Sequence, residues 1–332
     1  MASHTNKKLQ PEAAKHLREI LVNNKVFAVA LLLIVIMSFL SERFLTTTNV
    51  FNILRQICIT GIVASGFSLI IAAGEIDLSV GSIVAFVGIV TSYLMVTVKM
   101  PMVIATLAGL LVGMLCGMLN AVIISALDLP PFIVTLATQS LFRGVVYIWT
   151  NMVSIIGLPQ EFVNIGQGYL GVIPIPVIIM VATFLIVWFA TVKTSFGRHV
   201  IAMGGNKEAA YLCGVRISRV RLGIYGMVGL CCAVAAIVLT GRTASAQVSA
   251  GNGMEMDCIT AVVIGGTPFT GGKVNIVGTF IGAFIVGIIN NGLNLLAVDS
   301  NFQIIAKGLM ILIALIIDRL STNFLNKKRR KE

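Results

Sequence analysis

The stretch KTSFGRHVIAMGGNKEAAYLCGVRISRVR, residues 193–221, interrupts an otherwise apolar chain and fixes the orientation of the helices predicted on either side. It holds six Lys or Arg residues and one Glu between two hydrophobic segments, and no other internal stretch resembles it. A membrane protein leaves so long a basic loop on its cytoplasmic side. Residues 193–221 therefore predict a cytoplasmic loop that meets a soluble partner.

The composition excludes a water-soluble globule. Of 332 residues, 57% are hydrophobic and 11% are charged, and the mean hydropathy is +0.98. The apolar runs are long enough to cross a hydrocarbon core, which takes roughly 20 helical residues, and they lack the alternation of barrel strands. We expect an all-α polytopic membrane protein with about ten transmembrane helices. The expected helices cover residues 26–44, 50–73, 78–97, 101–126, 131–150, 172–192, 220–240, 255–268, 274–297 and 302–318.

Basic residues cluster at 7–25, 193–221 and 327–331. The positive-inside rule puts all three clusters in the cytoplasm, and an even number of spans returns both termini there. This clustering explains the net charge of +11 without a nucleic-acid partner. The predicted organisation is a cytoplasmic N-terminal tail (1–25), a transmembrane domain (26–318) that contains the loop 193–221, and a basic cytoplasmic C-terminal tail (319–332).

Two acidic motifs suggest an internal duplication. Glu75-Ile-Asp77 and Glu255-Met-Asp257 are separated by 180 positions, and Thr60-Gly61 matches Thr240-Gly241 at the same offset. The first acidic motif falls on the predicted inner side of the membrane and the second on the outer side. An inverted-topology repeat, with a helix broken at the corresponding place in each half, produces that arrangement. Chance matching of small residues is the alternative.

Asp77 and Asp257 are candidates for a translocation pathway. A carboxylate within the membrane costs about 2.5–3.5 kcal/mol by insertion scales, so such residues commonly serve a function. The alternative is a helix cap, because Asp followed by Leu-Ser-Val-Gly is typical of a helix start. In that case the two carboxylates would cap helices that begin at Leu78 and Cys258.

Five further polar residues lie within predicted spans. Asn290 and Asn294 share one helix face at the spacing i, i+4, as do Gln139 and Arg143. Amides bind hydroxyl groups of a solute, and they equally hold one helix against another, so both roles stay open. An intramembrane Arg faces the bundle interior or an interface. The pathway candidates are thus Asp77, Gln139, Arg143, Asp257, Asn290, Asn291 and Asn294.

Residues 206–213 of the basic loop predict a short helix. Asn206 is its N-cap, Glu208 lies in the first turn, Gly214 ends it, and residues 204–205 are a flexible entry. A compact capped helix fits the groove of another protein, whereas the alternative is a merely solvated loop. The candidate docking residues are Gly204, Gly205, Asn206, Glu208, Ala209, Ala210 and Gly214.

Catalytic and metal-binding motifs find no match in the sequence. GGTPFTGGKV, residues 265–274, departs from a phosphate-binding loop, which needs Gly where Thr267 stands and Ser or Thr where Val274 stands. The three His residues are scattered, and the six Cys residues lack metal-ligand spacing. We therefore expect a protein that is not an enzyme and that holds no metal or cofactor.

Four stretches carry a family resemblance: AAGEIDLSVGSIVAF (72–86), FGRHVIAMGGNKEAAYLCGV (196–215), EMDCITAVVIGGTPFTGGK (255–273) and VGTFIGAFIVGIINNGLNLL (277–296). With them the chain resembles the membrane permease of ribose-type ATP-binding-cassette sugar importers. The family often has Gly-Ile-Asp where Glu75-Ile-Asp77 stands, and its Thr-Ser-Leu-Ala-Gly-Gly is Thr-Pro-Phe-Thr-Gly-Gly in this chain. These departures bear on the substrate.

The resemblance implies a multi-pass protein of the bacterial plasma membrane. Two permease chains, expected to be a homodimer, would form the pathway, and a periplasmic or lipid-anchored binding protein would deliver a monosaccharide such as ribose. Separate ATPase subunits would hold the ATP and Mg, and residues 205–214 would be the coupling helix that transmits their closure. Pathway access would alternate by rigid-body rocking.

Two other functions are weighed against a sugar permease. A self-sufficient secondary carrier would move its solute without ATP, but the chain lacks an ion-site constellation of acids and has a partner-shaped loop. A permease for nucleosides or branched-chain amino acids would share the architecture and differ only in cargo.

Overall fold

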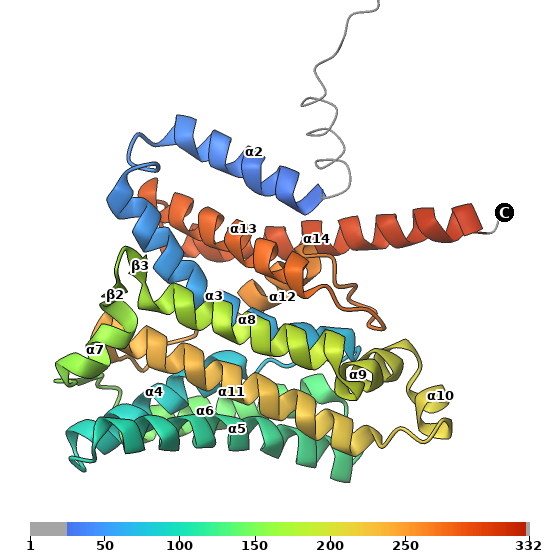
Figure 1. The fold of residues 1–332 in the computed structure, drawn as a ribbon, viewed down its shortest axis with the longest axis horizontal. Helices are drawn as coiled ribbons and strands as arrows, with labels where there is room; N and C mark the ends of the chain where they lie inside the picture. The colour runs from blue at the N-terminus through green and yellow to red at the C-terminus, as the bar shows by residue number, and fades with distance from the viewer. Residues whose placement is uncertain (1–24, 330–332) are drawn as a thin grey trace, which may run out of the picture.

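Figure 1 shows the computed structural model of the chain, in which residues 25–329 are described. The described part holds thirteen helices and four two-residue strands. Ten helices correspond to the ten expected ranges. They are α2 (Lys25–Leu40), α3 (Thr47–Ala72), α4 (Val80–Val96), α5 (Met102–Ala126), α6 (Pro131–Thr150), α8 (Ile175–Lys193), α11 (Ile217–Thr243), α12 (Met254–Ile264), α13 (Ile276–Leu295) and α14 (Ser300–Arg329).

The helices are those of a polytopic membrane protein. Within the described residues, six of them, namely α3, α5, α6, α8, α11 and α13, are long and apolar enough to cross a bilayer, and shorter apolar helices cover Val26–Leu40, Val80–Val96 and Asn301–Ile313. The outer helices expose many apolar side chains, as lipid contact requires, whereas α3, α11 and α13 are mostly buried.

Two of the ten helices begin inside the protein rather than at its ends. α4 follows the irregular connection 73–79, and α12, only 11 residues long, follows the irregular connection 247–253. The starts of the two helices adjoin, because a Cβ on Gly81 would overlap the carbonyl oxygen of Gly251 and lie 3.0 Å from Oε2 of Glu255. Both helices are largely buried. Side chains of α6 bond the irregular backbone that precedes them: Thr135 accepts from the nitrogen of Leu78, and Arg143 donates to the carbonyl oxygens of Val248 and Ala250.

The packing of α3–α6 is repeated by α11–α14. α11 packs on α5 and α4, and correspondingly α3 packs on α13 and α12. α4 contacts α5 and α6, while α12 contacts α13 and α14. Small residues permit the closest approach: a Cβ on Gly117 of α5 would overlap the Tyr225 carbonyl oxygen of α11.

Short elements cover the two ends of the bundle (Figure 1). At one end, α7 (Gln160–Gln167) lies beside two strand pairs, β1 (Ile155–Ile156) with β4 (Ser245–Ala246) and β2 (Tyr169–Leu170) with β3 (Ile173–Pro174). At the other end lie α9 (Ser195–Gly205) and α10 (Lys207–Leu212), and there α2 begins and α14 ends. We call these the α7 end and the α10 end.

The predicted tails are only partly covered by the structure. Residues 1–24 and 330–332 lie outside the described part, so the N-terminal tail is not tested. At the C-terminus the prediction of a helix ending at 318 is wrong, because α14 continues through the basic segment to Arg329. Lys and Arg are good helix formers, so the charges that end a membrane span do not end the helix.

Candidate functional site

The basic loop folds into two helices, and the predicted short helix is confirmed as α10. Oδ1 of Asn206 accepts a hydrogen bond of 2.9 Å from the backbone nitrogen of Ala209, which is an N-cap. Gly214 has a φ of +85°, a conformation that glycine adopts without strain, and it ends the helix.

The outer surface of α10 is more apolar than the sequence suggested. Tyr211 is 69% exposed and Leu212 is 83% exposed, next to the exposed Glu208 and Ala209. Ala210, one of the predicted docking residues, is buried and faces its own chain instead. The sequence prediction missed these two residues, although two large apolar side chains inside a basic loop are a pattern that indicates a contact surface.

The prediction that residues 204–205 form a flexible entry is wrong. Both are in the last turn of α9. A Cβ on Gly204 would overlap the carbonyl oxygen of Ala72 at the end of α3 and lie 2.8 Å from the nitrogen of Gly272. Gly204 therefore allows a close backbone contact, whereas the nearest neighbour of a Cβ on Gly205 would be 4.0 Å away.

Residues 265–273, the near match to a phosphate loop, complete this contact. The segment connects α12 to α13, and the Gly272 nitrogen donates a 2.9 Å hydrogen bond to the Ala72 carbonyl oxygen. Gly271, with a φ of +79°, packs against the backbone of Gly74. We call Gly74, Gly204, Gly271 and Gly272 the glycine seat. It joins α9 to the connections that flank α4 and α12.

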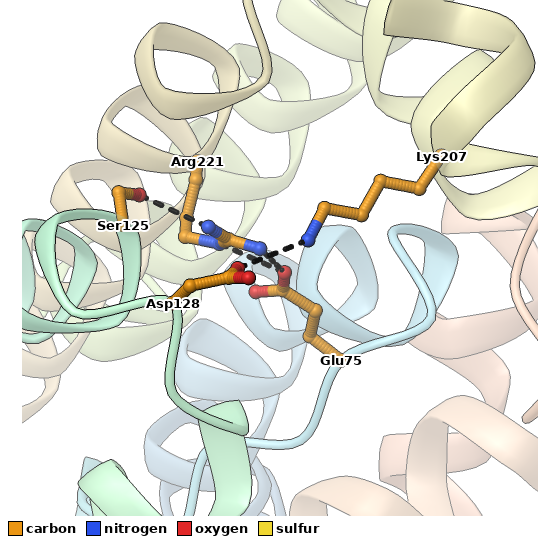
Figure 2. Close-up of polar contacts among 5 residues, drawn as sticks. All are labelled: Glu75, Ser125, Asp128, Lys207 and Arg221. Carbon is orange, nitrogen blue, oxygen red and sulfur yellow. Dashed lines mark hydrogen bonds and ion pairs between the residues drawn. The ribbon is translucent and has the colours of Figure 1, made fainter.

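A buried ion pair lies beside the glycine seat. Nε and Nη2 of Arg221 donate to Oε1 of Glu75 over 2.8 and 2.6 Å, and the two side chains are only 5% and 7% exposed. Nη1 of Arg221 donates to the hydroxyl of Ser125 over 3.0 Å. The guanidinium thus ties α11 to the α3–α4 connection and to the end of α5 (Figure 2).

A second, weaker ion pair links α10 to the same region. Nζ of Lys207 lies 3.7 Å from Oδ1 of Asp128 in the α5–α6 connection, and these side chains are 53% and 92% exposed. Figure 2 shows the two ion pairs close together. A cavity of about 530 Å³ opens between them and is lined by residues of α10, α11 and the end of α5.

Asp77 is fully buried in the α3–α4 connection. Its Oδ1 accepts hydrogen bonds from the backbone nitrogen and the hydroxyl of Ser79 over 2.7 and 2.6 Å, and the Ser79 hydroxyl accepts 2.8 Å from Nδ2 of Asn120. The prediction of a helix that begins at Leu78 is wrong, because α4 begins at Val80 and Asp77 bonds the residue before it.

Asp257 is not a cap either, since α12 begins three residues earlier at Met254. Its Oδ2 lies 2.9 Å from Nζ of Lys307 on α14 and accepts a long hydrogen bond of 3.4 Å from Nδ2 of Asn290 on α13. The first turn of α12 therefore precedes the apolar run that was expected to start the helix. Lys307 shares a helix face with Gln303 at the spacing i, i+4. This spacing is the sequence pattern that pointed to Lys307 as a residue of the polar interior.

The other two amides of α13 hold helices together. Asn291 and Asn49 of α3 exchange two amide hydrogen bonds of 3.0 and 3.1 Å in the protein interior. Asn294 is exposed and accepts 3.0 Å from Nε2 of Gln303. Asn291 therefore has the interhelical contact that one of the two predicted roles requires.

On α6, Arg143 fixes the chain that leads to α12. Its Nη1 donates to the carbonyl oxygens of Val248 and Ala250 over 2.8 and 2.9 Å. Gln139, one turn away, is half-buried and makes no side-chain hydrogen bond to the described residues. The pathway candidates thus form several separate contacts rather than one cluster.

Comparison with known proteins finds transport permeases that match most of the chain. The family described as "Branched-chain amino acid transport system / permease component" matches residues 49–315. The chain is similar to the ribose import permease of Bacillus subtilis, with 42% identity over 87% of this chain and 90% of that protein. No solved structure matches.

Two further relatives carry other sugars in their names. The D-allose transport system permease of Escherichia coli is 38% identical over 89% of this chain and 90% of that protein. The xylose transport system permease of Haemophilus influenzae is 32% identical over 90% of this chain and 96% of that protein. With its many apolar helices and a family match over most of its length, the chain belongs to this family of transport-system permease components.

Proposed function

We propose that this chain is the permease subunit of a binding-protein-dependent ATP-binding-cassette importer and forms the membrane pathway for a monosaccharide such as ribose. The observation that carries the cargo class is the similarity to ribose, allose and xylose permeases over about nine-tenths of the chain. The solute would cross without bond chemistry, while ATP and Mg would act in a separate ATPase subunit.

The α10 end is the cytoplasmic end in this proposal. It carries the basic segment 193–221, Lys273 and the basic end of α14, whereas the α7 end is poorer in basic residues. Ten helices, α2 to α6, α8 and α11 to α14, then cross or enter the membrane within a permease domain of residues 26–318, with 1–25 and 319–332 as cytoplasmic tails. The protein would lie in the bacterial plasma membrane.

The two sets α3–α6 and α11–α14 would be inverted repeats. The corresponding helices run in opposite directions, and each set has one shortened helix that begins in the protein interior, α4 or α12. The interior polar contacts also correspond. Asn120 of α5 reaches Asp77, just before α4, through the hydroxyl of Ser79, and Asn290 of α13 donates directly to Asp257 of α12. An inverted-repeat transporter places its solute path between such broken helices.

The coupling helix would be α10, seated by Gly204, Gly205, Asn206, Ala210 and Gly214 and presented outward through Glu208 and Ala209. Tyr211 and Leu212 add an apolar contact surface of the kind that docking helices use. The glycine seat carries any displacement of α9 directly to the connections beside α4 and α12, because the contact is between backbones. Closure of an ATPase pair would thereby rock both repeats.

The pathway would lie between two copies of the chain, on the side of α6 and α14. There Gln139, Arg143, Asn294 and Lys307 remain partly or fully exposed in an otherwise apolar membrane surface. Intramembrane polar groups face a cavity or a protein partner. The interior next to this side would contain the remaining pathway candidates, Asp77, Asp257, Asn290 and Asn291. A sugar-binding protein would deliver the solute at the α7 end.

The coupling role can be tested with the native cysteine Cys213, which directly follows α10. Within the described residues Cys213 is exposed and the other five cysteines are buried. A membrane-impermeant maleimide should label it in inside-out vesicles and not in intact spheroplasts, and added cognate ATPase should slow the labelling. Labelling from the external face would overturn the proposed orientation, and an unchanged rate with the ATPase bound would overturn docking at α10.

A second cargo has one observation in its favour, the branched-chain amino acid description of the matching family. Thermal stabilisation of the cognate binding protein by a panel of ribose, allose, xylose, nucleosides and leucine separates the cargo classes. Stabilisation by leucine alone would assign the second cargo. Uptake by the purified chain in ATP-free liposomes would instead establish a secondary carrier.

A further inference from the structure

The α3–α4 connection buries more negative than positive charge. Glu75 is 8% exposed and Asp77 is fully buried. Arg221 pairs with Glu75, and none of the ion pairs between described residues includes Asp77. If both acids were ionised, one negative charge would remain without a counter-ion in the protein interior, where an isolated charge is very unfavourable.

Unpartnered oxygen atoms gather around this charge. Oδ2 of Asp77 and Oδ1 of Asn120 are buried without a hydrogen-bond partner among the described residues, whereas the Tyr225 hydroxyl lies beside the Glu75 carboxylate and can donate to it. Asp77 and Asn120 are joined through the Ser79 hydroxyl, and each is fully buried. Buried acceptors nearly always have donors, so these two oxygens lack one. Oδ1 of Asp257 and Oδ1 of Asn290 are also unpartnered, so the Asp77 site is distinguished by its missing counter-ion.

The corresponding acid of the other set of helices already has its cation. Asp257 lies 2.9 Å from Nζ of Lys307 and also receives the Asn290 amide. Asp77 has the matching amide, Asn120 through Ser79, but no basic side chain of the described residues pairs with it. The two sites therefore differ by one positive charge.

We propose that the Asp77 site binds one monovalent cation, and that this cation is a proton held on Oδ2 of Asp77. A metal ion needs several oxygen ligands. Oδ1 of Asp77 is occupied by two hydrogen bonds from Ser79, and the Tyr225 hydroxyl lies beside the Glu75 carboxylate, so Oδ2 of Asp77 and Oδ1 of Asn120 are the free oxygens that remain. A proton balances the charge with a single acceptor. It also turns Oδ2 into a donor, which a buried acceptor such as Oδ1 of Asn120 can use.

The charged neighbours of Asp77 leave its negative charge unbalanced. The titratable and charged groups that face it are Glu75 on the same connection and Arg221, Tyr225 and Cys232 on α11. Arg221 is committed to Glu75 and Ser125, so it does not neutralise Asp77 as well. The inference depends on these contacts and not on the proposed cargo or partners.

The test is infrared absorption of the full chain in lipid vesicles over a pH series from mildly acidic to neutral. The wild type should show a protonated-carboxyl band that shifts in heavy water, is lost in Asp77→Asn and is retained in the matched control Asp257→Asn. Carbon-13 labelling of aspartate in the wild type should shift the same band, a readout that needs no substitution. A band that persists in Asp77→Asn, or that does not shift with the label, overturns the proposal.

Two arms separate the proton from other occupants. The spectra are repeated with choline in place of sodium and potassium, and the band should not change. A band that appears only after the metal ions are removed assigns a metal ion, and no band under either condition assigns water alone; both overturn the proposal.

A pH series of thermal stability gives an independent readout. Because the folded state favours the protonated acid, the melting temperature of the wild type should fall as the pH rises, and that of Asp77→Asn should fall less. Equal slopes in the wild type and Asp77→Asn would overturn the proposal.

Discussion

Removing the Arg221 side chain should strongly destabilise the protein, because it leaves Glu75 buried without a partner. Arg221→Met removes two hydrogen bonds to Oε1 of Glu75, at 2.8 and 2.6 Å, and one of 3.0 Å to Ser125. Breaking a buried ion pair from one side costs about 3–5 kcal/mol. The double variant Glu75→Gln with Arg221→Met removes both charges, so it should cost no more than Arg221→Met alone.

The assay is the free energy of unfolding of the purified chain in detergent micelles, measured by titration with a denaturing detergent for the wild type, each single variant and the double variant. The matched control is Lys207→Met, which breaks the exposed ion pair with Asp128 and should cost less than about 1 kcal/mol. The reasoning is refuted if Arg221→Met costs no more than Lys207→Met. It is also refuted if the double variant equals the sum of the singles within about 0.5 kcal/mol.

Three further predictions concern backbone contacts and interior amides. Gly204→Ala should cost about 1–3 kcal/mol by overlap with Ala72, whereas Gly205→Ala has open space and should be nearly neutral; equal effects in the same unfolding assay would contradict the glycine seat. Asn49→Ala and Asn291→Ala should each cost about 1–3 kcal/mol, with the double variant below their sum; strict additivity would argue against their reciprocal bonds. Arg143→Met should speed hydrogen exchange in residues 247–253 while α6 stays protected, and unchanged exchange there would rule out its role as a tether.

The sequence predicted the helices well because a membrane span is a local property. Apolar runs and the charges that flank them located ten helices, six of which are long and apolar enough to cross a bilayer within the described residues, and the cap at Asn206 located α10. Helix starts inside the protein were harder. α12 begins before Asp257, because its first turn contains the buried Glu255 and is therefore not part of an apolar run.

The partners of the polar residues could not be predicted. Arg221 and Glu75 are 146 positions apart, and Asn291 and Asn49 are 242 apart, so their contacts follow from the packing of helices and not from spacing along the chain. Gly204 shows the same limit in another form. A glycine pair beside a short helix is typical of a flexible joint, and only the nearby end of α3 reveals that it is a close contact.

The glycine seat has a consequence for how such chains can diversify. Its fit is made by main-chain atoms, whose shape is the same whatever side chains surround them, so cargo-facing residues can change over generations without disturbing it. A chimera that receives the 193–221 segment of a distant homologue should therefore assemble correctly whenever the donor keeps a glycine at the position of Gly204. If the 193–221 segment can be exchanged in this way, one ATPase could drive several permeases of different selectivity.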